Sequence, residues 1–320
     1  LLRNKIKMPG GLTDEQFNEN PEQSTRARNW LKTPWNIITA YANYTPTEKT
    51  TISLKSTYLF GNRSIVWRNE DGGAAAVDDI DPTTNQYVPR EVGKQDFNNS
   101  TTELRLSRQY NLGNNTSTIA GGARFSYGWF KRLGGGEGTT GSDFDLSITG
   151  DWGYDLDFTT TNVAPFVENI FRFGDKLSVT PGFRFEYLNS TAKGYKTEDD
   201  VRIASNESRK RYIPLAGVGL EYKTSRNTNI YGNISQAYRP IDYGELEPFG
   251  TTSRIDPNLK DASGYNTDLG YRGTIKNYLN FDIGAFYLAY NDRIGTVLKN
   301  DPVTNEAYTL RTNVANSAHK

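Results

Sequence analysis

Apolar and polar positions alternate strictly along several stretches of this chain. In residues 177–187 the odd positions are Leu, Val, Pro, Phe, Phe and Tyr, whereas the even positions are Ser, Thr, Gly, Arg and Glu. The same period of two runs through residues 51–60, 118–130, 265–273 and 279–289. A period of two is typical of β-strands that bury one face. The pattern therefore predicts an all-β fold.

The same reasoning, extended to the less regular runs, predicts eleven strands. They fall near residues 35–44, 50–60, 100–110, 116–130, 160–173, 176–189, 209–222, 228–238, 263–273, 278–290 and 307–317. In 35–44, 161–173 and 228–238 both faces mix apolar and polar residues, so the pattern does not assign their inward face.

Connections of two unlike lengths separate these strands. Five are tight turns, at Thr45–Lys49, Asn111–Asn115, Gly174–Lys176, Thr224–Asn227 and Thr274–Asn277. Between them lie five long polar stretches, near residues 61–99, 132–157, 190–209, 239–263 and 291–306. Short turns on one edge and long loops on the other predict an up-and-down antiparallel sheet with two different ends. That asymmetry is typical of outer-membrane β-barrels.

Charged residues indicate what the apolar face contacts. The apolar faces of the regular strands contain none, whereas the opposite faces carry Lys55, Arg124, Arg184, Asp268 and Asp282 in mid-strand. Aromatic residues, 20 Tyr, 15 Phe and 5 Trp, often lie near strand ends, as in the aromatic girdles of membrane barrels. A soluble β-sandwich or propeller remains an alternative fold, because the spacing of the tight turns, ~50–66 residues, overlaps the length of one propeller repeat. Two long strands per repeat favour hairpins of a barrel instead.

Composition excludes several other classes of protein. Lys and Arg total 37, as do Asp and Glu, so no basic excess points to a nucleic-acid partner. The chain has no Cys and a single His, His319, so neither a thiolate metal site nor a histidine-centred catalytic triad is expected. We therefore expect no enzyme activity and no cofactor.

The region from residue 231 onward carries an ordered series of motifs. It reads YGNISQAYRPIDYGELEPFG, DPNLKDASGYNTDLGYRG, YLNFDIGAFYLAYNDRIGTV and TNVANSAHK. This order resembles the C-terminal half of TonB-dependent outer-membrane receptors. The matching residues are Arg239, Pro240, Glu245, Leu246, Pro257, Leu259, Lys260, Leu269, Gly270, Tyr271, Arg272, Gly273, Phe286, Tyr287, Asp292, Ile294, Asn313 and Val314. Ala262 and Ile241 depart from the family pattern, at loop positions.

The resemblance implies a function and a larger protein. Bacterial single-chain barrels have even strand numbers, so eleven strands in residues 1–320 are expected to be part of a larger barrel. The resemblance implies a barrel of about 22 strands. The family's N-terminal plug and its last strands are expected to lie outside this chain. The resemblance implies a Gram-negative outer membrane, contact with TonB through the plug, and uptake of a scarce solute such as a ferric chelate. A passive porin and a glycan-uptake receptor remain alternatives.

Residues 10–31, GGLTDEQFNENPEQSTRARNWL, resemble an extracellular segment of the ferric dicitrate receptor group. The same residues also predict a short helix that begins with a capping box at Thr13. Because a ferric citrate chelate is anionic, its receptor needs arginine donors at the outer mouth. Strand parity places Arg63 and Arg132 on the inner side at loop-side strand ends, and Arg239 also lies at such an end. Asp78, Asp79 and Asp81 form a weak calcium candidate, because clustered carboxylates can supply oxygen ligands.

Overall fold

The computed structural model describes residues 2–8, 10–68, 77–78, 80–198, 200–248, 253–276 and 278–319. Within these residues, thirteen strands form one sheet in the order β1-β2-β3-β6-β7-β8-β9-β10-β11-β13-β14-β15-β12. The strands are β1 (Leu2–Lys7), β2 (Trp30–Thr47), β3 (Thr50–Trp67), β6 (Glu91–Leu112), β7 (Asn115–Glu137), β8 (Tyr154–Phe173), β9 (Leu177–Glu198), β10 (Val201–Lys223), β11 (Thr228–Arg239), β12 (Ser253–Ile255), β13 (Ala262–Ile275), β14 (Leu279–Asn300) and β15 (Ala307–His319). A separate hairpin joins β4 (Ile80–Asp81) and β5 (Gln86–Tyr87).

All eleven predicted strands are present, and neighbours along the chain pair antiparallel from β2 to β15, apart from the inserted strands β4, β5 and β12. The all-β, up-and-down prediction is therefore confirmed. Two strands of the sheet were not predicted: β1, which pairs antiparallel with β2, and β12, which pairs parallel with β15. With only six and three residues, these strands show no clear apolar period.

The stretch 190–209 was predicted to be a long loop, and this is wrong. β9 continues to Glu198 and β10 resumes at Val201, with an unbroken register between them. Both faces of this hairpin are polar, so its sequence has a loop-like pattern although its backbone hydrogen bonds are those of a sheet. Strands also extend into the other four long stretches, which shortens the connections between them.

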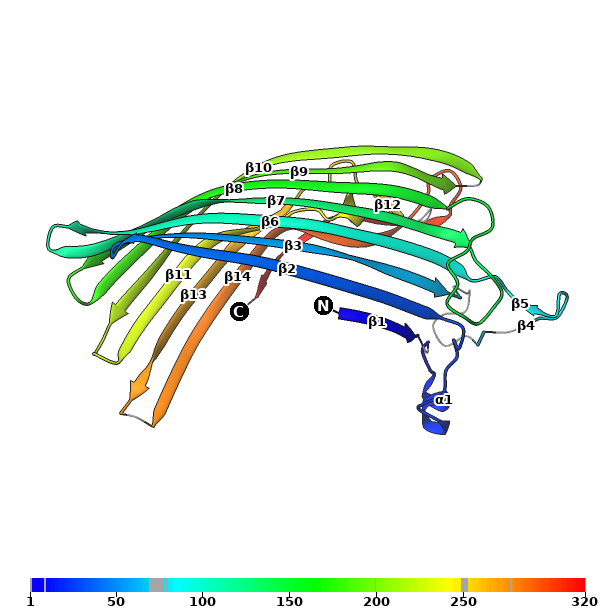
Figure 1. Cartoon of the computed structure of the whole chain (residues 1–320), viewed down its shortest axis with the longest axis horizontal. Coiled ribbons are helices and arrows are strands. Elements are labelled where there is room, and N and C mark those ends of the chain that lie inside the picture. The colour runs from blue at the N-terminus through cyan, green and yellow to red at the C-terminus, as the bar shows by residue number, and fades with distance from the viewer. Residues whose placement is uncertain are drawn as a thin grey trace.

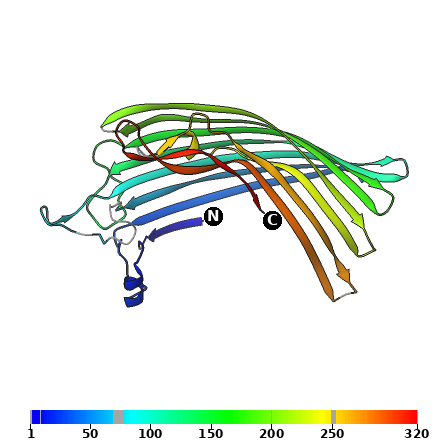
Figure 2. The ribbon, with the colours of Figure 1, turned by 180° about the vertical axis from the view of Figure 1, so that it is seen from behind.

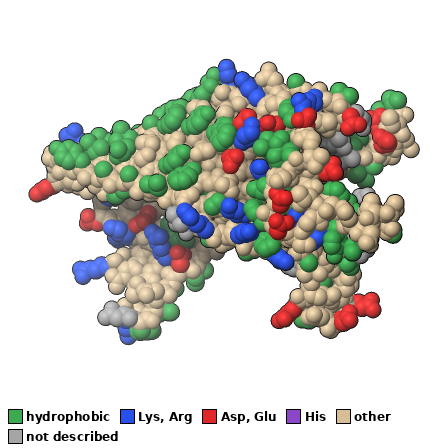
Figure 3. Space-filling view, turned by 45° about the vertical axis from the view of Figure 1, so that its right-hand side comes forward, with side chains coloured by type: hydrophobic (Ala, Val, Ile, Leu, Met, Phe, Trp, Pro, Cys, Tyr) green, Lys and Arg blue, Asp and Glu red, His purple; other side chains and the backbone are tan. Residues whose placement is uncertain are grey.

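The sheet curves strongly, so that β11 to β15 lie beneath the concave side of the earlier strands (Figure 1, Figure 2). We call the convex side the outer face and the concave side the inner face. Phe183 and Ile283 point to the outer face and are 48% and 70% exposed, whereas Glu186 on the inner face is 5% exposed. Figure 3 shows hydrophobic side chains gathered in a band on the upper surface, toward the tight-turn end. This distribution is that of a barrel with lipid outside.

Pairing assigns the inward face of the three strands that the sequence left open. Trp35 of β2 stands opposite Gly61, and Phe158 of β8 stands opposite Phe130, all on the inner face. In β11, Arg239 and Ser235 both lie on the inner face. After Ser235, β11 separates from β10, and the side chain of Gln236 accepts a hydrogen bond from the backbone N–H of Ala216 at 2.8 Å.

Two short helices lie in the connections. α1 (Asp14–Glu19) begins with the predicted capping box, in which Thr13 and Gln16 each accept a hydrogen bond from the other's backbone N–H. α2 (Tyr243–Leu246) follows β11 and is capped by Asp242 in the same way. None of the helices among the described residues has the length and hydropathy that crossing a membrane requires.

Candidate binding site on the inner face

Four aromatic side chains from neighbouring strands form a row on the inner face near the long-loop end. Ring centroids are 5.0 Å apart for Trp35 and Phe97, 4.8 Å for Phe97 and Phe130, and 5.6 Å for Phe130 and Phe158. Tyr243 of α2 continues the row, 4.8 Å from Phe158. These stacked rings give the inner face a flat apolar shelf, which we call the aromatic row.

A glycine makes the first contact of the aromatic row possible. Gly61 of β3 lies between Trp35 and Phe97, opposite both in the register. A Cβ atom at this position would lie 2.5 Å from the carbonyl oxygen of Pro34 and 3.4 Å from the Trp35 ring. Only glycine leaves the space in which Trp35 reaches across β3 to Phe97.

Two of the predicted arginines lie in the next row toward the long loops. Arg63 stands opposite Gln95, and Gln95 stands opposite Arg132, so the three residues cross β3, β6 and β7 in line. Arg63 donates a long hydrogen bond of 3.5 Å to the Gln95 amide oxygen, and Arg132 lies 5.4 Å from the centre of the Tyr154 ring. The structure thus places Arg63 and Arg132 side by side with one amide between them, above the aromatic row.

Residues 240–248 and 253–261, which we call the inner loop, turn back onto the inner face after β11. Ile241, Leu246 and Leu259 are nearly fully buried there and pack in one cluster with Leu156 and Phe158. This stretch was predicted as a polar extracellular loop, and its apolar residues are the signal that could have indicated burial. The inner loop covers the inner face of β8 and β9 at the level of the aromatic row.

Ion pairs hold the inner loop against strand residues. Glu247 accepts from Lys196 at 3.2 Å and Asp261 from Arg211 at 3.0 Å. The Tyr243 hydroxyl donates to the Thr160 hydroxyl oxygen at 2.9 Å. Burial raises the pKa of the Tyr243 phenol above its ordinary value.

The third predicted arginine, Arg239, lies outside the row of Arg63. Its two terminal nitrogens contact the two carboxylate oxygens of Glu245 at 3.0 and 2.8 Å, and Glu245 is only 1% exposed. Arg293 and Arg311 line the same cavity, of about 510 Å³, and Arg311 reaches Glu245 at 3.9 Å. Arg239 and Arg311 therefore share the buried carboxylate of Glu245, and the cavity lining holds three arginines against this one carboxylate.

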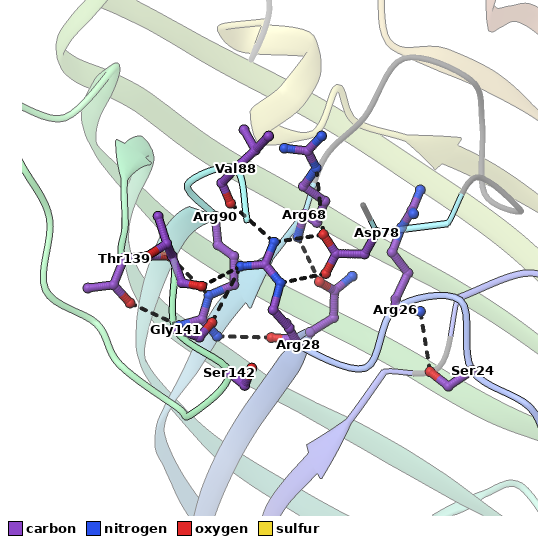
Figure 4. A network of polar contacts seen from close by, with 12 residues as sticks. Ser24, Arg26, Arg28, Arg68, Asp78, Val88, Arg90, Thr139, Gly141 and Ser142 are labelled. Atoms are coloured by element: carbon purple, nitrogen blue, oxygen red, sulfur yellow. Dashed lines mark hydrogen bonds and ion pairs between the residues drawn. The ribbon is translucent and has the colours of Figure 1, made fainter. Parts of the chain in front are cut away.

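A second polar network closes the long-loop end, and the sequence did not indicate it (Figure 4). Arg28, 2% exposed, donates to both carboxylate oxygens of Asp78 at 2.6 and 2.7 Å and to three backbone carbonyls. Arg90, 1% exposed, donates to the carbonyls of Arg28, Thr139 and Asp143. Burial and the charge of Arg28 lower the pKa of Arg90. This arginine clamp joins residues 24–29, 80–90 and 138–143 through Asp78 and the two guanidinium groups.

The same contacts bear on the calcium candidate. Both carboxylate oxygens of Asp78 are occupied by Arg28, and Asp81 instead accepts from the backbone of Thr83 at 2.7 Å. This hydrogen bond from the Thr83 backbone lowers the pKa of Asp81. Asp79 lies outside the described residues. Within the described part of the chain, no group of three or more His, Cys, Asp or Glu side chains is placed to hold a metal ion.

An open, strongly curved antiparallel sheet with an apolar outer face and a polar, aromatic-lined inner face defines the class of membrane β-barrel proteins. Comparison with known families identifies the particular one. The family described as TonB dependent receptor-like, beta-barrel, matches residues 4–319. The chain therefore belongs to the TonB-dependent receptor family.

Solved structures share this fold at low sequence identity. The unliganded ferric citrate transporter FecA has a TM-score of 0.73 and 17% identity over 91% of this chain and 40% of its own. The siderophore receptor PiuA from Acinetobacter baumannii has a TM-score of 0.66 and 18% identity over 91% and 44%. The copper transporter OprC has a TM-score of 0.65 and 14% identity over 90% and 43%. The chain spans less than half the length of each, and a search of curated proteins gave no match.

Proposed function

We propose that this chain is the barrel part of an outer-membrane receptor for TonB-dependent uptake of a ferric chelate, with ferric citrate as the first candidate. Family membership supports the transporter class, and the barrel domains of this family belong to Gram-negative outer membranes. By the family's pattern, energy reaches the receptor through a plug and TonB, and the barrel supplies the outer binding surface.

The choice of solute rests on the positions of Arg63 and Arg132. These two arginines stand on either side of Gln95 above the aromatic row. Guanidinium groups bind carboxylates through charge-assisted, often bidentate hydrogen bonds. Arg63 has the neutral Gln95 amide as its hydrogen-bond partner, and the Arg132 guanidinium lies over the Tyr154 ring. An anionic chelate at this level would meet two cations and one amide, with an apolar shelf beneath.

Two alternative functions, a passive channel and a glycan receptor, need different features of the protein. A passive channel needs no plug and no TonB, and a glycan receptor needs hydrogen-bonding groups and flat aromatic rings more than cations. The aromatic row suits a sugar ring, so glycan uptake is the second candidate function. A soluble propeller is disfavoured, because blades of four short strands do not form one continuous sheet of thirteen.

The location can be checked directly. We expect the full-length receptor to fractionate with the outer membrane and to need detergent for extraction, because the outer face of its strands is apolar. Membrane fractionation followed by immunoblotting measures this. Recovery as a soluble monomer without detergent would contradict the barrel.

The solute can be tested with three single variants of the full-length receptor, Arg63→Ala, Arg132→Ala and Arg239→Ala. A hydrogen bond to a charged group contributes about 1.5–3 kcal/mol, so losing one contact should weaken ferric citrate binding about ten-fold or more. Isothermal titration with ferric citrate gives the Kd. We expect the largest losses for Arg63 and Arg132.

Arg226→Ala provides the matched control, because Arg226 lies in the tight turn 224–227 at the other end of the barrel. Its affinity should equal that of the wild type. If all three test variants also bind normally, or the wild type fails to bind ferric citrate, the assignment of ferric citrate is wrong and only the transporter class stands. Binding of maltooligosaccharides instead would favour the glycan alternative.

A further inference from the structure

The cavity of about 510 Å³ beside Arg239 lies on the inner face, between α2 and the strands β11, β13, β14 and β15. Its charged lining residues are Arg239, Glu245, Arg293 and Arg311. Besides its two contacts with Arg239, Glu245 accepts a hydrogen bond from the backbone N–H of Asp242 at 2.8 Å. The Glu245 carboxylate is therefore already engaged by Arg239 and by the capping box of α2.

The other two arginines of the cavity have unused hydrogen-bond donors. Arg311 comes no nearer than 3.9 Å to Glu245, which is beyond hydrogen-bond length. Arg293 has neither a hydrogen bond nor an ion pair within the part of the chain that the structure describes. Arg293 is exposed, and the Arg311 side chain is 41% exposed, so the lumen can reach both guanidinium groups.

The nearest acidic residues of the inner loop are engaged with other cations. Asp242 contacts Arg239 at 3.5 Å, and Asp261 contacts Arg211 at 3.0 Å. The protein thus brings two guanidinium groups into one cavity and supplies a close carboxylate to neither.

A β-bulge turns Arg293 into the cavity. Tyr290 faces inward opposite Ser317, and Arg293 follows three residues later, so a regular strand would point Arg293 outward. The register shifts between these two residues of β14, and Asp292 has a φ of 54°. Arg293 consequently stands opposite Ala315, on the same face of β15 as Ser317. Bulges commonly re-aim a side chain beside a functional site.

Side-chain amides hold this bulge in place. The backbone N–H of Asp292 donates to the side-chain oxygen of Asn316 at 3.0 Å. The Asn313 amide donates to the carbonyls of Asp292 and Lys260, at 2.6 and 3.0 Å. Because Lys260 belongs to the inner loop, one side chain ties the loop to the bulge. The backbone that carries Arg293 is therefore ordered before a ligand arrives, which lowers the cost of binding.

We propose that Arg293 and Arg311 form a binding site for a small organic dicarboxylate, with one carboxylate on each guanidinium. Guanidinium groups bind carboxylates through charge-assisted, often bidentate hydrogen bonds. Two free cations match the two charges of such a ligand, and the cavity has the volume of a small-molecule pocket. The hydroxyl groups of Tyr290 and Ser317 in the lining are further donors.

This dicarboxylate site is separate from the Arg63–Arg132 row and does not depend on the solute proposed above. Arg63 and Arg132 belong to β3 and β7, whereas the dicarboxylate site belongs to β14 and β15. In the sheet, β8, β9 and β10 lie between β7 and β11. The helix α2 connects the two regions, because Tyr243 ends the aromatic row while Glu245 lines the cavity.

The test titrates full-length receptor in detergent with succinate, and isothermal titration calorimetry gives the Kd. The variants are Arg293→Gln and Arg311→Gln. Lys299→Gln is the matched control, because it removes one positive charge from the same strand as Arg293. Lys299 stands opposite Tyr308, which lies on the other face of β15 from Arg311. Monomethyl succinate, which has a single carboxylate, is the control ligand.

We expect each cavity variant to bind succinate about ten-fold or more weakly than the wild type, because it loses one of two charge-assisted contacts. Lys299→Gln should bind like the wild type, and monomethyl succinate should bind the wild type about ten-fold more weakly than succinate. Undiminished binding by Arg293→Gln, equal binding of the two ligands, or no binding of succinate by the wild type would overturn the proposal.

Three further measurements identify the site. Heat-modified mobility on gels shows whether each variant is folded, and Arg293→Gln carries the test if Arg311→Gln is not. A loss in Arg63→Gln as large as that in Arg293→Gln would place succinate in the Arg63–Arg132 row and overturn the proposal. Inorganic phosphate that bound through Arg293 as tightly as succinate would mark a general oxyanion site and overturn the dicarboxylate assignment. A receptor that bound succinate through Arg293 but no ferric citrate would refute the proposed solute and leave the dicarboxylate site standing.

Discussion

Asp78→Ala should release the loops at the outer end of the barrel. Asp78 is the carboxylate that neutralises Arg28, and the two side chains are 6% and 3% exposed. Removing one partner of a buried ion pair leaves the other charge uncompensated, which costs about 3–5 kcal/mol. Because Arg28 also holds the carbonyls of Val88 and Thr140, we expect residues 80–90 and 138–143 to open together.

Hydrogen exchange followed by mass spectrometry measures this opening. Amides of both segments should exchange about a hundred-fold faster or more in Asp78→Ala, while those of the tight turns stay unchanged. Asp81→Ala is the matched control, since Asp81 lies in the same connection and its carboxylate accepts hydrogen bonds from the neighbouring residues Thr83 and Thr84. Equal acceleration in the two variants would show that the arginine clamp does not join the segments.

Phe183→Arg should destabilise the barrel in lipid by about 2–4 kcal/mol. Phe183 points outward and is 48% exposed, near the middle of the outward apolar positions that run from Leu177 to Tyr187 on β9. An arginine there would lie in hydrocarbon. Urea titration of full-length receptor folded into phosphatidylcholine vesicles gives the free energy of unfolding.

Thr180→Arg introduces the same residue three positions away on the inner face, and Asp282→Asn removes an inner-face charge near the tight-turn end. Both should change the free energy of unfolding by much less, because the lumen tolerates polar side chains. In Asp282→Asn, the new amide oxygen could still accept the hydrogen bond that the Tyr231 hydroxyl gives Asp282 at 2.9 Å. Losses as large as that of Phe183→Arg would contradict the assignment of faces.

The sequence predicted the strands well because membrane barrels repeat one local rule. Lipid on one side and water on the other impose the period of two that identified β7, β9 and β14. The rule fails where water contacts both faces of the sheet. The end of β9 after Asn189 and the start of β10 before Arg209 therefore had the sequence pattern of a loop. The rule also fails in β2, β8 and β11, where inner-face aromatic residues such as Trp35 and Phe166 mix the pattern.

The candidate site was only partly predictable. Extending strand parity from residues 51–60 and 118–130 placed Arg63 and Arg132 on the inner face, and the register confirms that facing. Their role in binding a solute stays a prediction. The partner of Arg239 and the arginine clamp depend on loop paths that parity does not fix, because contacts such as Arg28 with Asp78 join residues fifty positions apart.

The inner loop has an electrostatic consequence for the function proposed above. Glu245, Glu247 and Asp261 bring three negative charges to Arg239, Lys196 and Arg211. The carboxylates of the inner loop thus neutralise three cations of the inner face while the loop stays covalently attached to the barrel. An anionic solute that moved it aside would exchange one set of ion pairs for another, with little change in net charge. A neutral solute of the same size that displaced the loop would leave those cations unneutralised, so displacing the loop would cost more free energy for a neutral solute than for an anion.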